Sequence, residues 1–132
     1  MSDATSENTS DVQQVVQANN QFAMDLYSKL AAMKNGDLFC SPSSISFALA
    51  MAYAGAVGDT ASEIAEAMHF SLPSNRLHEA MRALQEDTKT SGAEFQIANR
   101  LWGQRDYHFL SKFVQITERY YGAPIALSLI HI

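Results

Sequence analysis

Four histidines and one cysteine are the residues of this chain best suited to bind a metal or attack a substrate. No two histidines are three or four positions apart and no HExxH motif occurs, so none are spaced like the zinc ligands of a helix. Cys40 stands in an apolar stretch with no activating partner, where a thiol usually packs as a small hydrophobic group. We expect no metal site, no cofactor and no catalytic thiolate, and we expect the histidines at surface or boundary positions. They are His69, His78, His108 and His131.

Serine and glycine gather in two segments that could also do chemistry. The serines around Pro42 lack the GxSxG pattern of a nucleophile, and their hydroxyls are better placed to cap and line a helix. The segment GAVGDT, residues 55–60, superficially resembles a phosphate-binding loop. It lacks the lysine followed by serine or threonine that such a loop needs, and it follows a helical pattern rather than a strand. These residues predict no enzymatic activity. The serines are Ser41, Ser43, Ser44 and Ser46.

The overall composition excludes two classes of partner. The chain has 132 residues, of which 47% are hydrophobic, enough for one domain with a buried core. Nine basic against 14 acidic residues give a net charge of −5, which disfavours binding to nucleic acid. The longest apolar run, residues 45–57, is too short to cross a bilayer. We therefore expect no nucleic-acid partner and no membrane partner.

Apolar periodicity and capping residues predict five helices. Ser41 before Pro42 is suited to cap the second helix, and Thr60 with Glu63 forms a capping box for the third. The polar segment 1–11 predicts a disordered tail. The five helices are expected near residues 12–33, 42–55, 60–69, 74–90 and 110–121.

Two further segments have patterns that are typical of strands. Residues 38–40 fit a short buried strand, and the alternation of apolar and polar residues over 95–102 predicts a clear one. Residues 45–57 are apolar on every side, so this helix must be covered on all sides. Such a helix does not fit a small free-standing bundle, and the strand near Ile97 needs neighbouring strands.

Three segments, in this order, resemble the N-terminal part of a serpin. They are NNQFAMDLYSKL (19–30), LFCSPSSISFALAMAYAGAVGDTASEIAEAMHF (38–70) and IANRLWGQRDYHFLSKFVQITERYYGA (97–123). The resemblance implies an α+β serpin fold represented by an N-terminal fragment. That fragment is mostly helical, with helices like A to E, one strand of the large central sheet and one short buried strand. Residues 12–126 then form an incomplete part of one serpin domain. Residues 127–132 depart from the family pattern and are expected to be a non-native C-terminal extension.

Serpins are mostly inhibitors of serine proteases that act as suicide substrates. The protease cuts an exposed reactive loop, which then inserts as a new strand in the large sheet. The resemblance implies a fragment of such an inhibitor that lacks the reactive loop, is itself inactive and is not an enzyme. A serine protease is then the partner of the full-length parent only. Two alternatives remain open: a non-inhibitory serpin-like structural or chaperone-type protein, and an unrelated helical binding module.

The resemblance also assigns residues to the shutter region, where the sheet opens to admit the loop. Ser41, Ser44 and Asn99 are implied there, since short hydroxyls and an amide can exchange hydrogen bonds between two states. Asp37 stands where the family usually has asparagine, and an ionised carboxylate only accepts hydrogen bonds.

The fourth predicted helix and the start of the chain bear on partners and location. This helix balances three basic against three acidic residues, so no heparin-like polyanion is expected as a partner. No secretory signal is visible at the start, which indicates a cytoplasmic protein. A start further upstream would instead allow an extracellular one, as in many serpins.

Overall fold

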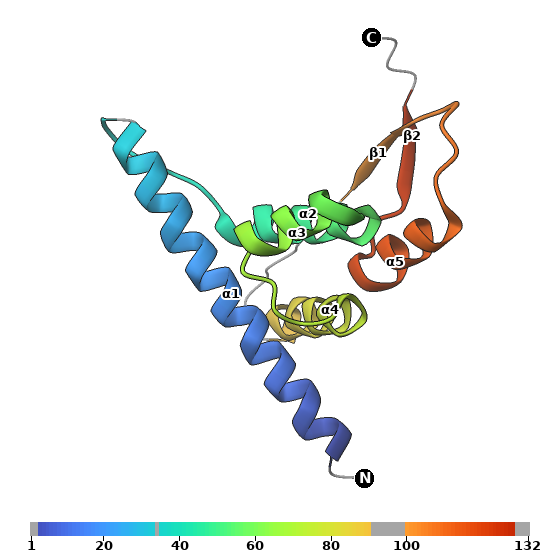
Figure 1. Ribbon diagram of the computed structural model, residues 1–132, viewed down its shortest axis with the longest axis horizontal. Helices are drawn as coiled ribbons and strands as arrows, with labels where there is room; N and C mark the ends of the chain where they lie inside the picture. The colour runs from blue at the N-terminus through green and yellow to red at the C-terminus, as the bar shows by residue number, and fades with distance from the viewer. Residues whose placement is uncertain (1–2, 34, 91–99, 129–132) are drawn as a thin grey trace.

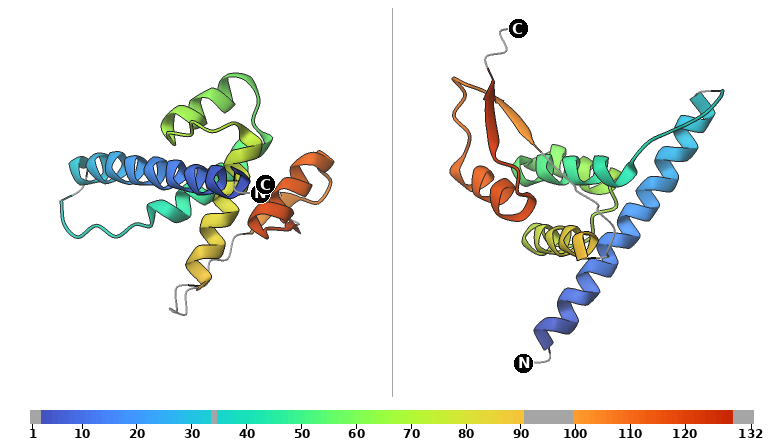
Figure 2. Two further views of the ribbon diagram at one scale, coloured as in Figure 1. Left: turned by 90° about the horizontal axis from the view of Figure 1, so that it is seen from below. Right: turned by 180° about the vertical axis from the view of Figure 1, so that it is seen from behind.

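The computed structural model describes residues 3–33, 35–90 and 100–128, and its elements surround a core shared by four helices. Figure 1 shows α1 as a long diagonal helix, with α4 beside it and the two strands on the far side of α2; Figure 2 shows the same arrangement from two further sides. The elements are α1 (Asp3–Met33), α2 (Pro42–Gly55), α3 (Gly58–Ala67), α4 (Ser74–Thr90), β1 (Leu101–Gln104), α5 (Ser111–Tyr121) and β2 (Ile125–Ser128).

The core forms where α1, α2, α4 and α5 meet. Each of these helices contributes apolar side chains that are at most a few per cent exposed, and each such side chain stabilises the fold by about 1.5–3 kcal/mol when fully buried. The ring of Phe47 meets the ring of Tyr121 edge-on, with centroids 6.4 Å apart. The largest of these buried residues include Val15, Phe47, Met51, Leu77, Met81 and Tyr121.

The predicted helices are largely confirmed. Helix α2 begins at Pro42 as expected, and the Ser41 hydroxyl caps it by accepting a hydrogen bond from the Ser44 N–H at 3.4 Å. Helix α4 has the predicted bounds, and α5 begins one residue later than predicted. Gly122 ends α5 with φ of 58°, a left-handed conformation that glycine adopts without strain.

The N-terminal prediction is wrong from Asp3 onward, because α1 already begins there rather than near residue 12. Asp11 lies at 6% exposure, and its carboxylate accepts two hydrogen bonds from Arg76 of α4, at 2.6 and 2.8 Å. This contact fixes the helix before the predicted start. Extending a helix that is already formed gains one hydrogen bond per added residue, so it can continue through a polar segment.

The capping box predicted for the third helix is also wrong. Helix α3 begins at Gly58, and its N-cap Val57 makes no side-chain cap hydrogen bond, so Thr60 and Glu63 lie within the helix. Gly58 has φ of 59°, which allows a sharp turn between α2 and α3. The turn therefore determines this helix start, and the polar side chains do not.

The strand predictions fare worse than the helix predictions. Residues 38–40 form no strand, and Phe39 is fully exposed. A strand needs a neighbour to pair its N–H and C=O groups, and no described segment is paired with residues 38–40. Of the strand predicted over 95–102, residues 95–99 lie outside the described part of the chain, and the described strand is β1.

The described sheet consists of two parallel strands. Strand β1 pairs with β2, from Leu101 opposite Ile125 to Gln104 opposite Ser128. The sequence did not predict β2, which includes Leu127 and Ser128 of the segment expected to be an extension.

Helix α2 is apolar from Phe47 onward but is covered on one side only by the described residues. Ser46, Phe47, Ala50 and Met51 are buried, whereas Ile45 and the alanines of the opposite side are exposed. Full coverage of residues 45–57 is therefore not found. No described helix combines the length and the apolar character that crossing a membrane requires.

Candidate functional site

The two serines expected in the shutter lie together at the start of α2. Their hydroxyl oxygens are 2.8 Å apart, and both side chains are exposed. Proline at the first position of the helix removes one N–H that would otherwise lack a partner. The Ser41 hydroxyl oxygen accepts from the Ser44 N–H and also lies within hydrogen-bond distance of the Ser44 hydroxyl. The pair offers two hydroxyls that can each donate or accept, and so can change partners at low cost.

The other two predicted shutter residues are not brought to this pair. Asp37 is exposed, and among the described residues no hydrogen bond joins it to Ser41 or Ser44. Asn99 lies outside the described residues.

The sequence patterns did not predict a second polar contact, which lies behind the serine pair. The Ser46 hydroxyl, which is fully buried, donates a short hydrogen bond to the side-chain oxygen of Asn19 on α1. This contact ties α1 to α2 through the interior. A serine within an otherwise apolar helix was the available signal, since a buried hydroxyl needs a partner.

A third polar group lies between α4 and α5. His78 is 1% exposed, so its expected surface or boundary position is wrong. Its Nδ1 lies 2.6 Å from the Tyr121 hydroxyl and its Nε2 lies 3.2 Å from the Ser74 hydroxyl. Burial lowers the pKa of His78 to about 4 and raises the pKa of Tyr121, because both charged forms lose hydration. The sequence signal was the position of His78 directly after Leu77, on the apolar side of α4.

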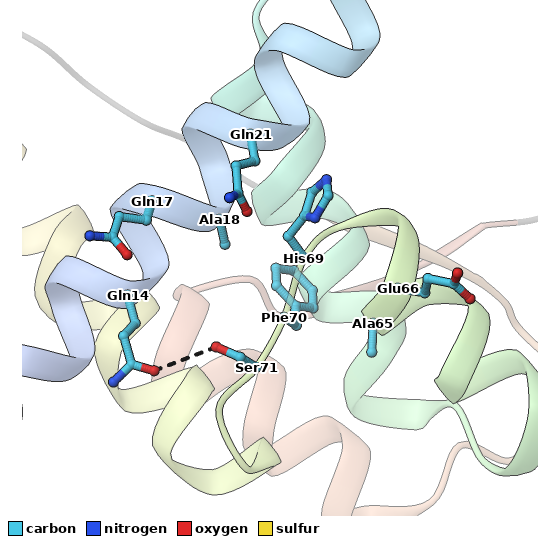
Figure 3. Close-up of a pocket in the computed structure, with 9 residues that line it drawn as sticks. All are labelled: Gln14, Gln17, Ala18, Gln21, Ala65, Glu66, His69, Phe70 and Ser71. Atoms are coloured by element: carbon cyan, nitrogen blue, oxygen red, sulfur yellow. Dashed lines mark hydrogen bonds between the residues drawn. The ribbon is translucent and has the colours of Figure 1, made fainter.

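A polar groove of about 480 Å³ separates α1 from the segment that joins α3 to α4. Figure 3 shows Gln14, Gln17 and Gln21 of α1 on one side, with His69 and Ser71 across from them. Ser71 donates to Gln14 at 3.4 Å, and His69 Nε2 lies 2.7 Å from an Asp25 carboxylate oxygen. The described lining of the groove includes three glutamine amides, the imidazole of His69, the hydroxyl of Ser71 and the carboxylate of Glu66, and the Ser71 hydroxyl donates to an amide rather than to a base.

The described residues also bear on metal binding. Among them, no three side chains of histidine, cysteine, aspartate or glutamate lie close enough together to hold a metal ion. The polar contacts described above involve hydroxyls, amides, the imidazoles of His69 and His78 and the carboxylate of Asp25.

Comparison with known proteins gives the chain a context. The family model described as Serpin (serine protease inhibitor) matches residues 17–128. A leukocyte elastase inhibitor of Bos taurus is 39% identical over 118 residues, which cover 87% of this chain and 31% of that protein. The leukocyte elastase inhibitor of Homo sapiens is 38% identical over 120 residues, with the same coverage of each chain.

Solved structures give the same picture. Human glycosylated kallistatin superposes with a TM-score of 0.80 at 29% identity, over 87% of this chain and 32% of that one. Cleaved kallistatin in complex with heparin gives 0.82 at 28% identity, over 89% and 36%. The chain thus spans about a third of the length of the proteins it matches. The family match reaches Ser128, the second residue of segment 127–132, whose non-native origin stays a prediction.

Proposed function

Since the chain belongs to the serpin family, we propose that it is the N-terminal part of an inhibitor of serine proteases. The observation that carries this proposal is the family match over residues 17–128. In the proposed mechanism the protease cleaves an exposed loop of the full-length protein and becomes acylated. The loop then inserts as an additional strand of the large sheet before the acyl bond is hydrolysed. The nucleophile is the protease's serine, so the inhibitor itself is not an enzyme.

In this mechanism the described residues provide part of the sheet and of the region that lets it open. The parallel pair of β1 and β2 provides two neighbouring strands. The hydroxyls of Ser41 and Ser44 exchange hydrogen bonds as the sheet parts, and the amide of Asn99 adds a donor and an acceptor. Asp37 provides a carboxylate where the family usually has an amide, so it can accept a hydrogen bond but not donate one when ionised.

We propose that the chain of 132 residues does not inhibit proteases by itself. Inhibition needs a reactive loop and a sheet that can accept it, and the chain covers only 31% of the leukocyte elastase inhibitor from Bos taurus. Cleavage at the exposed Arg100 or Arg105 by a trypsin-like protease would be ordinary proteolysis.

The test uses proteases of elastase, chymotrypsin, trypsin and subtilisin type, with elastase first because the matched relatives are named for it. Each is mixed with the purified chain, and with a longer product encoded by the downstream reading frame, and run on denaturing gels. We expect no adduct with the chain and a denaturant-stable adduct of the longer product. An adduct with the chain alone would contradict its inactivity. A longer product that every protease leaves free or simply degrades would favour a non-inhibitory serpin.

We further propose that this part of the protein does not bind heparin-like polyanions. Arg76 of α4 pairs with Asp11, and Arg82 pairs with Glu86 at 2.9 Å. A polyanion that contacted either guanidinium group would also meet the neighbouring carboxylate, whose negative charge weakens its attraction.

A further inference from the structure

The interface between α4 and α5 encloses a histidine with both ring nitrogens engaged. His78 contacts the hydroxyl of Tyr121, the last residue of α5, and the hydroxyl of Ser74, the first residue of its own helix. His78 and Tyr121 are 1% and 2% exposed. The buried imidazole therefore joins the exposed Ser74 at the beginning of α4 to the buried end of α5.

The neutral ring satisfies every polar atom of this cluster. Neutral imidazole has one N–H donor and one acceptor nitrogen, and each partner is a hydroxyl that can donate or accept. Tyr121 stays protonated at any ordinary pH because burial raises its pKa. With the ring hydrogen on Nε2, Tyr121 donates to Nδ1 and the ring donates to Ser74, so both ring nitrogens and the buried hydroxyl are paired.

The protonated ring does not fit this arrangement. Imidazolium has two N–H donors and no acceptor, so both hydroxyls must accept. The hydroxyl hydrogen of Tyr121 then loses the ring as its acceptor, and the described residues give it no second one. An unpaired buried donor and a buried charge without a counter-ion both cost free energy.

Among the described residues, the groups that face His78 include no counter-ion for that charge. Tyr53 of α2, Tyr120 and Tyr121 of α5 surround the ring, with centroids 5.6–6.4 Å away. The guanidinium of Arg119 lies over the ring of Tyr120 at 5.3 Å, and Glu118 of α5 makes no hydrogen bond or ion pair with His78 within the part of the chain that the structure describes.

The carboxylates near His78 in sequence or along α4 serve other partners or solvent. Asp11 of α1 pairs with Arg76, Glu86 pairs with Arg82, and Glu79 is exposed. In the described chain, no carboxylate is in contact with the imidazole.

We propose that His78, Tyr121 and Ser74 form an acid-sensitive latch, which holds α4 against α5 at neutral pH and releases it when His78 takes up a proton from solvent. The consequence reaches the sheet, because only Gly122, Ala123 and Pro124 separate Tyr121 from β2. This inference does not depend on the proposed inhibitory function.

The pH window follows from the direction of the shift. The pKa of His78 is lowered from 6.5 to about 4 in the folded chain, so the neutral ring's contribution to stability is complete above pH 6.5. It is lost as the pH falls from 6.5 toward 4. Over that window the unfolding equilibrium of the interface should shift by about 300-fold at most.

The first experiment follows the exchange of each histidine's ring carbon hydrogen for deuterium by mass spectrometry, on the unmodified chain across a pH series. This measurement works at low protein concentration and reports the titration of each histidine separately. We expect His78 to titrate at a lower pH in the folded chain than in the same chain unfolded in urea. Titration of His78 at the same pH in the folded and the unfolded chain would overturn the proposal, whether the interface fails to form or the ring remains hydrated.

The second experiment compares backbone amide protection in α4 and α5 at about pH 7 and about pH 4.5 in three chains: the unmodified one, His78→Gln and His69→Gln. Glutamine keeps hydrogen-bonding capacity at position 78 without titrating. After correction for intrinsic exchange, the unmodified chain and His69→Gln should lose on the order of 50-fold of their protection, and His78→Gln far less. The latch is wrong if His78→Gln loses as much, or if α4 and α5 of the unmodified chain are unprotected at pH 7.

Discussion

At the scale of single residues, three of the described polar contacts join one helix to another: Ser46 with Asn19, Arg76 with Asp11, and His78 with Tyr121. Ser46 shows this best, because its hydroxyl is fully buried within an apolar helix and donates to Asn19 of α1. Ser41 and Ser44 make the same kind of hydroxyl contact at the surface, where water can replace it. Burial therefore distinguishes a hydroxyl that stabilises the fold from one that is free to change partners.

We expect Ser46→Ala to destabilise the chain by about 1–2 kcal/mol, because it leaves the Asn19 side chain without its buried partner. The measurement is urea unfolding followed by circular dichroism. Ser43→Ala, an exposed change in the first turn of the same helix, is the matched control and should stay within about 0.5 kcal/mol. Equal stability of the two variants would show that the contact between α1 and α2 contributes nothing.

At the scale of elements, local signals determined the helices and distant contacts determined the strands. Pro42 after Ser41, and Gly122 after Tyr121, fix the ends of α2 and α5 within the chain itself. Strand β1 instead depends on β2, more than 20 positions later, which no pattern within either segment can reveal. Asp11 extends α1 through Arg76 for the same reason, since the sequence does not show that the two residues meet.

The closest packing in the strand region surrounds Gly103 of β1. A Cβ at this position would lie 2.6 Å from Cε2 of Phe109 and 3.0 Å from Cγ2 of Ile125. Gly103→Ala must therefore displace Phe109, whose ring also packs against Phe113 and Tyr107, and we expect a loss of about 1–3 kcal/mol.

The chain's one tryptophan reports this change, because Trp102 precedes Gly103. Urea unfolding followed by Trp102 fluorescence should show the lowered midpoint. Gln104→Ala, an exposed change on the same strand, should leave it within about 0.5 kcal/mol of the unmodified chain. A Gly103→Ala chain as stable as Gln104→Ala would contradict the packing argument.

At the scale of the whole molecule, the net charge and the pairing of the arginines determine how strongly the chain binds polyanions. The net charge is −5, and the arginines of α4 described above are paired with carboxylates. We expect no retention on immobilised heparin at physiological ionic strength. The double variant Asp11→Asn, Glu86→Gln, which releases Arg76 and Arg82 from these carboxylates, should be retained more than the unmodified chain. Binding of the unmodified chain would show that paired arginines remain available.

The parallel pairing of β1 with β2 also dictates an order of folding. Two parallel strands cannot be joined by a tight turn, and here the connection from Gln104 to Ile125 contains all of α5. The entropic cost of closing this loop is smaller if α5 has already packed against α2 and α4 through Tyr121. During synthesis β1 leaves the ribosome before its partner exists, so its backbone edge stays open until α5 and then β2 have followed. We therefore expect helix docking to precede strand pairing, which pulsed hydrogen exchange would check by showing protection of α5 before protection of β1 and β2.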